Sequence, residues 1–179
     1  MQTGIRIDSP VIGCRPGTGP ALMELPTDLR LWVGDWGLVT MALDSVQAEW
    51  PEAGGAQAGC SDHLCKPMML TLLTYCYAAG IYASEDIELA PAHSPQIRYI
   101  CAGQHPEADT IRQFRRANRA QIERSLARVL GEAWRRTIGE TEWASEPGRP
   151  LEAPVRGSIQ QLVGHKLQLA VLMDTAGDD

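Results

Sequence analysis

The stretch ADTIRQFRRANRAQIERSLARVL, residues 108–130, decides the fold class of this chain. It contains no glycine or proline, and apolar residues recur along it at helical spacing. Thr110 and Gln113 have the spacing of a capping box, and the next glycine is Gly131. The sequence therefore predicts one long helix that begins near Thr110 and runs to about Leu130, or as far as Thr137.

The predicted helix is strongly basic. Eight arginines and two acidic residues between positions 110 and 136 give a charge of +6, whereas the whole chain carries −6. At about 100° per residue, four of these arginines lie within an arc of about 100° and form a ridge. They are Arg112, Arg115, Arg116 and Arg119. From Ile122 onward the apolar face shifts by roughly 60–70°, so we expect the two halves to pack against different elements.

The ridge has two interpretations. Arginines on one side of a helix can contact successive phosphates or guanine edges of DNA. Thr110, Gln113 and Asn118 would then add hydrogen bonds to phosphate or adenine. Alternatively, the ridge is a solvated surface whose arginines pair with acidic residues elsewhere in the chain.

The rest of the chain is also expected to be helical. Residues 66–79 are apolar on nearly every face and predict a central buried helix, opened by Pro67 and ended by Gly80. Shorter helices are predicted at 29–33 after a cap at Thr27 or Asp28, at 36–50 after Asp35, after a cap at Ser84, and at 94–100. The sequence thus predicts an all-α, compact multi-helix domain over residues 27–137, preceded by an irregular segment, 1–26.

Two further segments complete the predicted organisation. Residues 138–157 are rich in proline and glycine and predict a linker, and residues 158–179 form an amphipathic C-terminal segment. Within 159–173 the apolar residues fit a helix, although Leu167, Leu169, Val171 and Met173 also alternate as in a strand. The length of the segment favours the helix.

Composition and local motifs narrow the expected function. The longest apolar run is too short to span a membrane, and the start MQTGIRIDSPVIG lacks the pattern of a secretory signal. Five cysteines without a disulfide pattern are typical of free thiols in the cytoplasm. No catalytic triad or phosphate-binding glycine loop is suggested by local spacing, so we expect no catalysis, no cofactor and no small-molecule substrate.

A short segment contains residues that could bind zinc. Cys60, His63 and Cys65 supply three possible zinc ligands within six residues, and Cys101 with His105 would supply a second pair if the fold brought them close. The alternative, a loop with two free thiols, is favoured because a second pair of ligands is missing nearby. We expect no metal.

Several segments in series carry a family resemblance. They are Pro67 to Gly80; Ser84, Glu85, Ile87 and Glu88; Arg98 and Tyr99; the turn at 103–106; and Thr110, Ile111, Phe114, Arg115 and Arg116. This series resembles the N-terminal, InsH-type domain of insertion-sequence DDE transposases. The resemblance covers about residues 25–130, with its core at 66–119. It departs at Ala108 and Asp109, where many members have His-Ser.

The resemblance implies a helical, helix-turn-helix-like domain that binds DNA or oligomerises. The family's chemistry belongs to a following RNase H-like domain, in which three carboxylates hold two metal ions. Only 49 residues follow Leu130, and Asp174, at the end of an apolar run, is a single carboxylate. We therefore expect a non-catalytic protein whose partners are DNA and either a second copy or a full-length transposase. The alternative is a protein-interaction or oligomerisation module that does not bind DNA.

The residues expected to contact DNA are Thr110, Arg112, Gln113, Arg115, Arg116, Asn118 and Arg119.

Overall fold

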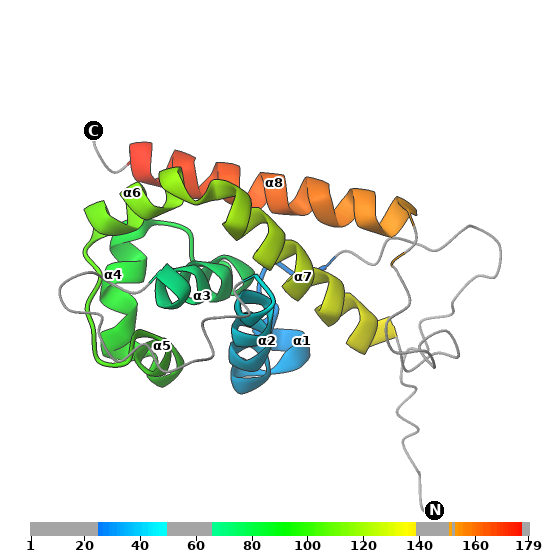
Figure 1. Ribbon diagram of the computed structural model, residues 1–179, viewed down its shortest axis with the longest axis horizontal. Helices are drawn as coiled ribbons and strands as arrows, with labels where there is room; N and C mark the ends of the chain where they lie inside the picture. Colours follow the sequence, from blue (N-terminus) through cyan, green and yellow to red (C-terminus); the bar gives the residue numbers. More distant parts are fainter. Residues whose placement is uncertain (1–24, 50–65, 139–150, 152, 177–179) are drawn as a thin grey trace, which may run out of the picture.

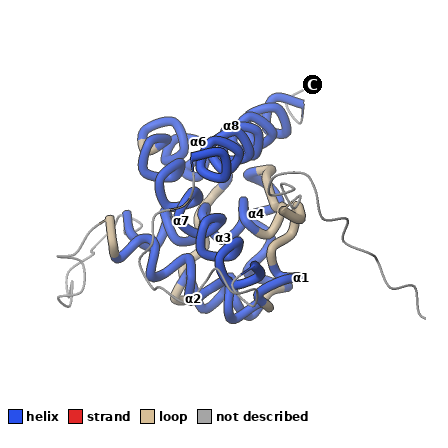
Figure 2. The backbone as a smooth tube through the Cα atoms, turned by 90° about the vertical axis from the view of Figure 1, so that its right-hand side faces the viewer, coloured by secondary structure: helices blue, strands red, loops and turns tan. Residues whose placement is uncertain are grey.

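The described part of the chain is an assembly of α-helices. The computed structural model describes residues 25–49, 66–138, 151 and 153–176, and within them all regular structure is helical (Figures 1 and 2). The helices are α1 (Arg30–Val33), α2 (Asp35–Gln47), α3 (Lys66–Ala78), α4 (Ser84–His93), α5 (Pro95–Cys101), α6 (Ala108–Ala117), α7 (Arg119–Ile138) and α8 (Ala153–Ala176). The predicted all-α fold class is confirmed. Most of the predicted irregular segment, 1–26, lies outside the described residues.

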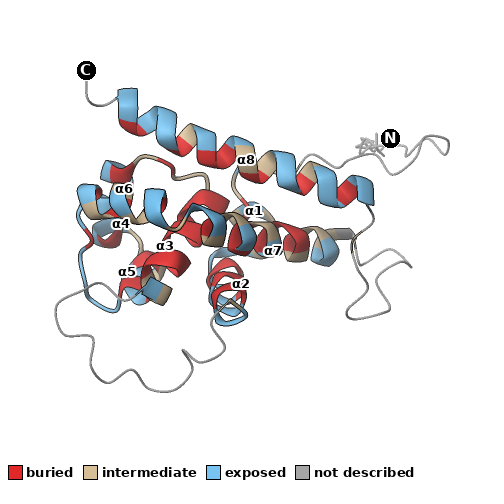
Figure 3. Cartoon of the chain, turned by 45° about the horizontal axis from the view of Figure 1, so that its top comes forward, coloured by how far each residue is buried: buried red, intermediate tan, exposed pale blue. Residues whose placement is uncertain are grey.

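Helix α3 occupies the centre, as its apolar sequence predicts. Every residue from Met69 to Ala78 is buried, and α2, α5, α7 and α8 all pack against it (Figure 3). Gly80 ends this helix with a φ of +80°, which only glycine adopts without strain. A Cβ atom at position 80 would also lie 3.4 Å from the carbonyl oxygen of Thr27.

Local signals account for several helix starts, but not for all. Asp28 accepts a hydrogen bond from the backbone N–H of Arg30 at 2.9 Å, and the Ser94 hydroxyl accepts one from Ile97 at 3.3 Å. The predicted caps at Ser84 and Thr110 are wrong. Ser84 is the first residue of α4 and turns its hydroxyl toward another helix, and α6 already begins at Ala108.

The predicted single basic helix is two helices. The backbone leaves helical geometry at Asn118, with φ −121° and ψ 25°. The Asn118 side-chain amide donates to the Phe114 carbonyl at 3.0 Å, while the Asn118 carbonyl accepts from Gln121 and Ile122. A short amide side chain that binds nearby backbone competes with a continuous helix. The break also resolves the shift of the apolar face, because α6 packs on α4 whereas α7 packs on α2, α3 and α8.

Helix α8 confirms the helical interpretation of residues 159–173 and is longer than predicted. It begins at Ala153, so residues 153–157 of the predicted linker belong to it. Val155, Ile159, Val163 and Leu167 are buried, and α8 packs along α7 (Figure 3). The C-terminal segment is therefore part of the same hydrophobic core as the preceding helices.

A buried lysine ties α8 to the centre. The Lys166 Nζ atom donates to the carbonyl oxygens of Thr27 at 2.8 Å and Tyr77 at 3.1 Å, and to the Tyr82 hydroxyl at 3.1 Å. Burial lowers the pKa of Lys166 to about 8, although the charge of Asp28 opposes this shift. The Lys166 side chain thus supplies hydrogen bonds to backbone carbonyls at the C-terminal end of α3 and in the segment before α1.

No helix in the described ranges has both the length and the apolar character needed to cross a membrane.

Candidate nucleic-acid interface

The predicted DNA-contact residues lie on both sides of the break at Asn118. Five of them belong to α6, Asn118 lies at the junction, and Arg119 is the first residue of α7. The four arginines of the predicted ridge therefore do not form one continuous helical surface. Their environments divide them into an interior pair, Arg112 and Arg115, and an exposed pair, Arg116 and Arg119.

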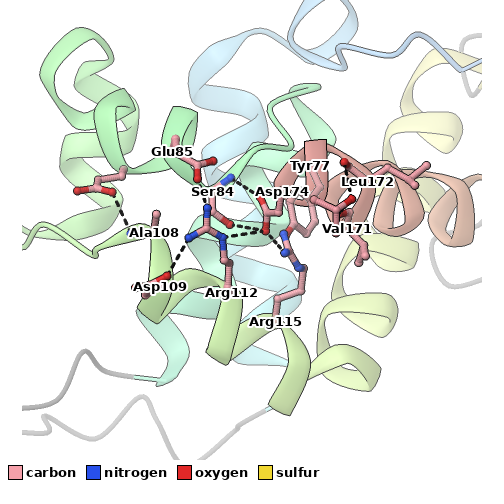
Figure 4. A network of polar contacts seen from close by, with 12 residues as sticks. Tyr77, Ser84, Glu85, Ala108, Asp109, Arg112, Arg115, Val171, Leu172 and Asp174 are labelled. Atoms are coloured by element: carbon pink, nitrogen blue, oxygen red, sulfur yellow. Dashed lines mark hydrogen bonds and ion pairs between the residues drawn. The ribbon is translucent and has the colours of Figure 1, made fainter. Parts of the chain in front are cut away.

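Arg115 faces the interior of the protein. Only 5% of its surface is exposed. One guanidinium nitrogen donates to the Tyr77 hydroxyl at 3.3 Å, and the other forms a hydrogen-bonded ion pair with Asp174 in the last turns of α8 (Figure 4). Arg115 therefore joins α6 to α3 and α8, and its charged group does not face solvent.

Arg112 is surrounded by carboxylates. It forms ion pairs with Glu85 and with Asp109, the latter at 2.8 Å, and its Nε atom lies 3.6 Å from Asp174 (Figure 4). Its side chain is 16% exposed. These contacts connect α6 to the first turn of α4 and to the end of α8.

Asp174 is the centre of this network. Its carboxylate accepts the Ser84 backbone N–H at 2.8 Å and the Ser84 hydroxyl at 2.9 Å, in addition to Arg115. Burial favours a raised pKa for Asp174, but the hydrogen bonds from Arg115 and Ser84 outweigh it, and the pKa lies below its usual range. The carboxylate is therefore charged at neutral pH and is engaged by residues of this chain.

Three of the residues expected to contact DNA are exposed: Gln113, Arg116 and Arg119. Arg119 pairs with Glu123 one helical turn away at 2.9 Å, in a contact that is open to solvent. Arg116 has no ion pair with any described residue. Thr110 is half-buried, and Asn118 uses its amide within the junction.

Helix α7 contributes four further arginines to the surface. Their side chains are each about half exposed: Arg124, Arg128, Arg135 and Arg136. Arg124 and Arg128 share Glu49, at 2.8 and 3.1 Å, and Arg135 and Arg136 share Glu132, at 3.2 and 3.1 Å. Because each carboxylate serves two arginines, this surface keeps an excess of positive charge.

Asp174, the single carboxylate at the end of the apolar run 171–174, does not form part of a catalytic site with other carboxylates of the described residues. Residues 171–174 are helical, and the Asp174 carboxylate is occupied by Arg115 and Ser84. Within the described ranges, no three His, Cys, Asp or Glu residues are grouped closely enough to hold a metal ion. Cys60, His63 and Cys65 lie outside the described residues. Cys101 is buried with a free thiol, and burial raises its pKa to about 11.

None of these ion pairs was predicted from the sequence, although the local ones could have been predicted from spacing. Arg119 with Glu123 and Asp109 with Arg112 have the i,i+4 and i,i+3 spacings that place side chains on neighbouring turns. The other contacts join distant parts of the chain. Glu49 lies 75 positions from Arg124, and Asp174 lies 59 positions from Arg115 and 90 from Ser84. The one available signal was an aspartate within the apolar run at the end of α8, because a charge there needs a partner.

Comparison with protein families, with curated proteins and with solved structures finds no match to this chain. The transposase resemblance stays a prediction.

Proposed function

We propose that this chain is a non-catalytic DNA-binding protein that contacts the phosphate backbone at the junction of α6 and α7. Exposed Arg116 and Arg119 carry the proposal, together with Gln113. They belong to the most basic stretch of a chain whose overall charge is −6. Such a separation of charge orients a protein toward a polyanion with its basic surface first.

To contact DNA, an arginine of the predicted ridge must give up any ion pair that it forms, and the cost of this differs between the exposed pair and the interior pair. Arg119 would exchange a surface ion pair, worth at most about 1 kcal/mol, for a phosphate contact. Arg115 would leave Asp174 buried without its partner, which costs roughly 3–5 kcal/mol. The proposed contact set is therefore Gln113, Arg116 and Arg119, and Arg112 and Arg115 hold the fold.

The transposase resemblance supports a particular role for this binding. It includes Thr110, Phe114, Arg115 and Arg116, which flank or belong to the proposed contact surface. The role that follows is binding of transposon ends, or regulation of a full-length transposase, in the cytoplasm and without a cofactor. DNA is the partner, and a second copy or the transposase itself is the expected protein partner.

DNA binding is tested by fluorescence anisotropy with a labelled duplex over a series of salt concentrations. We expect Arg116→Ala/Arg119→Ala to weaken binding several-fold and to reduce the slope of log K against log[salt] by about two, since each phosphate contact contributes about 0.9. Arg98→Ala/Arg156→Ala removes the same charge from exposed positions on α5 and α8 and serves as the control. No binding by the wild type, or equal weakening in the control, contradicts the proposal.

A second candidate, the protein-interaction module, is favoured by one observation. Val171, Leu172 and Met173 are each about half exposed, although they are consecutive apolar residues near the end of α8. Exposed apolar side chains in a group are typical of protein contacts. A dimer that persists in high salt and dissociates on Leu172→Glu, in a protein that does not bind DNA, would favour this candidate.

A further inference from the structure

Three arginines form a line along the solvent side of α7. At about 100° per residue, Arg124, Arg128 and Arg135 lie within about 40° of one another, and they span about 16 Å of helix. The opposite side of α7 is buried in the core through Ile122, Leu126, Val129, Leu130 and Ala133. We call these three arginines the α7 ridge.

The α7 ridge lies between two open hollows. One hollow, of about 500 Å³, lies on the surface where α7 meets α8 and is lined by Arg124, Arg128 and Gly164 among others. The other, of about 440 Å³, separates α7 from α2 and is lined by Arg128, Arg135 and Asp44 among others. Arg128 borders both hollows, so the ridge has room on either side for a strand of nucleic-acid backbone.

Glu49 pairs with two of the three arginines of the ridge, whereas Arg135 pairs with Glu132. Glu49 follows α2 and is itself little exposed. One carboxylate oxygen accepts a hydrogen bond from Arg124 at 2.8 Å, and the other forms an ion pair with Arg128 at 3.1 Å. The two guanidinium groups remain about half exposed while bound to it. A phosphate group offers acceptors of the same kind to the same two donors.

We propose that the α7 ridge is a second DNA-backbone contact surface and that Glu49 opposes the binding of phosphate to Arg124 and Arg128. The inference rests on the proposed function and extends the DNA-facing surface from the α6–α7 junction along α7. The Glu49 carboxylate is nearly as buried as that of Asp174, so removing both of its arginine partners would carry a similar penalty. Bound phosphate would instead contact the exposed half of each guanidinium group and lie beside the Glu49 carboxylate, which repels it. Glu49 therefore lowers the affinity of the ridge for DNA.

The test uses the same anisotropy assay with a labelled duplex of mixed sequence. We expect Glu49→Gln to tighten binding several-fold, because it releases two arginines and removes a repulsive charge. We expect Arg124→Ala/Arg128→Ala to weaken binding several-fold and to lower the salt slope by about two. Asp86→Asn, at an exposed acidic position of α4, makes the same change in charge as Glu49→Gln and should have a much smaller effect.

The outcomes separate this inference from the proposed function. Weakened binding in Arg116→Ala/Arg119→Ala, with no change in Glu49→Gln and Arg124→Ala/Arg128→Ala, overturns the α7 ridge and leaves the proposed function standing. No binding by the wild type at low salt overturns both. Polyglutamate that displaces the duplex as effectively as unlabelled DNA overturns the assignment of the ridge to phosphate. Circular dichroism melting of each variant distinguishes lost contacts from a lost fold.

Discussion

The carboxylate of Asp174 caps helix α4 at Ser84, ninety positions earlier in the chain. It accepts both the Ser84 backbone N–H at 2.8 Å and the Ser84 hydroxyl at 2.9 Å. The first N–H groups of a helix lack partners within the helix, and α4 has no side-chain cap from Ala83. The last turns of α8 therefore complete the start of α4, and negative charge at that end is stabilised by the helix dipole.

Replacing Asp174 should destabilise the whole domain. Asp174→Ala leaves the Arg115 guanidinium buried without a counter-charge, so we expect a loss of about 3–5 kcal/mol in the free energy of unfolding. Urea denaturation followed by circular dichroism measures the change. Asp109→Ala is the control, since that side chain is 80% exposed and should cost no more than about 1 kcal/mol. Equal losses in the two variants would contradict the structural role of Asp174.

Lys166 should make stability depend on pH in the alkaline range. Its pKa in the folded protein is about 8, below its ordinary value of 10.5, so the unfolded chain binds more protons between these values. The free energy of unfolding gained from this residue should therefore rise with pH across that window, by up to about 3 kcal/mol. Urea denaturation of the wild type and Lys166→Met at several pH values provides the measurement.

The difference in the free energy of unfolding between the wild type and Lys166→Met isolates the contribution of Lys166. The buried thiols and the Tyr77 hydroxyl have raised pKa values, which lower stability as the pH rises, but they are present in both proteins. A wild-type advantage over Lys166→Met that stays constant from pH 8 to 10 would show that the amine is not desolvated as the fold requires.

Replacing either of two leucines on α8 with alanine should reduce stability by very different amounts. Leu167 is 1% exposed and packs in the core, so Leu167→Ala should cost about 2–5 kcal/mol of stability. Leu172, five residues later, is 54% exposed, and Leu172→Ala should change stability by no more than about 0.5 kcal/mol. Thermal unfolding measures both. A small loss at Leu167 would contradict the docking of α8 on α7.

Replacing two glycines with alanine should change the stability of the protein in opposite directions. A Cβ atom at Gly164, inside α8, meets nothing within 4 Å, so Gly164→Ala should stabilise the protein by about 0.5–1 kcal/mol. Gly80 has a φ of +80°, and Gly80→Ala should destabilise it by about 1–2 kcal/mol. Differential scanning calorimetry of the two variants checks the contrast, and a destabilised Gly164→Ala would contradict the open space beside that position.

The sequence specifies the helices more fully than it specifies their contacts. The apolar composition of α3 and the positive φ at Gly80 follow from neighbouring residues, and both were predictable. The break at Asn118 was not predicted, although the shift of the apolar face on either side of it was the relevant sign. A rigid straight helix cannot turn two differently placed apolar faces toward one core, and the chain bends instead.

The candidate site depended on information that local spacing does not contain. Counting arginines located the basic stretch, but exposure decides which of them can meet a ligand. Arg115 and Arg116 are adjacent in sequence and about 100° apart on a helix, and one is buried while the other is exposed. The charge of the buried Arg115 is compensated by Asp174, which lies 59 positions away on another helix. Only the packing of α8 brings the two together.

The contact between Lys166 and Thr27 also constrains how the protein is made. These residues are 139 positions apart, yet Lys166 satisfies the carbonyls beside the earliest described helix and at the end of α3. Helix α8 leaves the ribosome after every other described helix, so the parts of α3 and α7 that α8 covers stay exposed until α8 has been synthesised. Closure of the core is consequently a late event dominated by long-range contacts, which are slow to form. Nascent chains stalled before α8 should therefore be the species that chaperones and proteases encounter first.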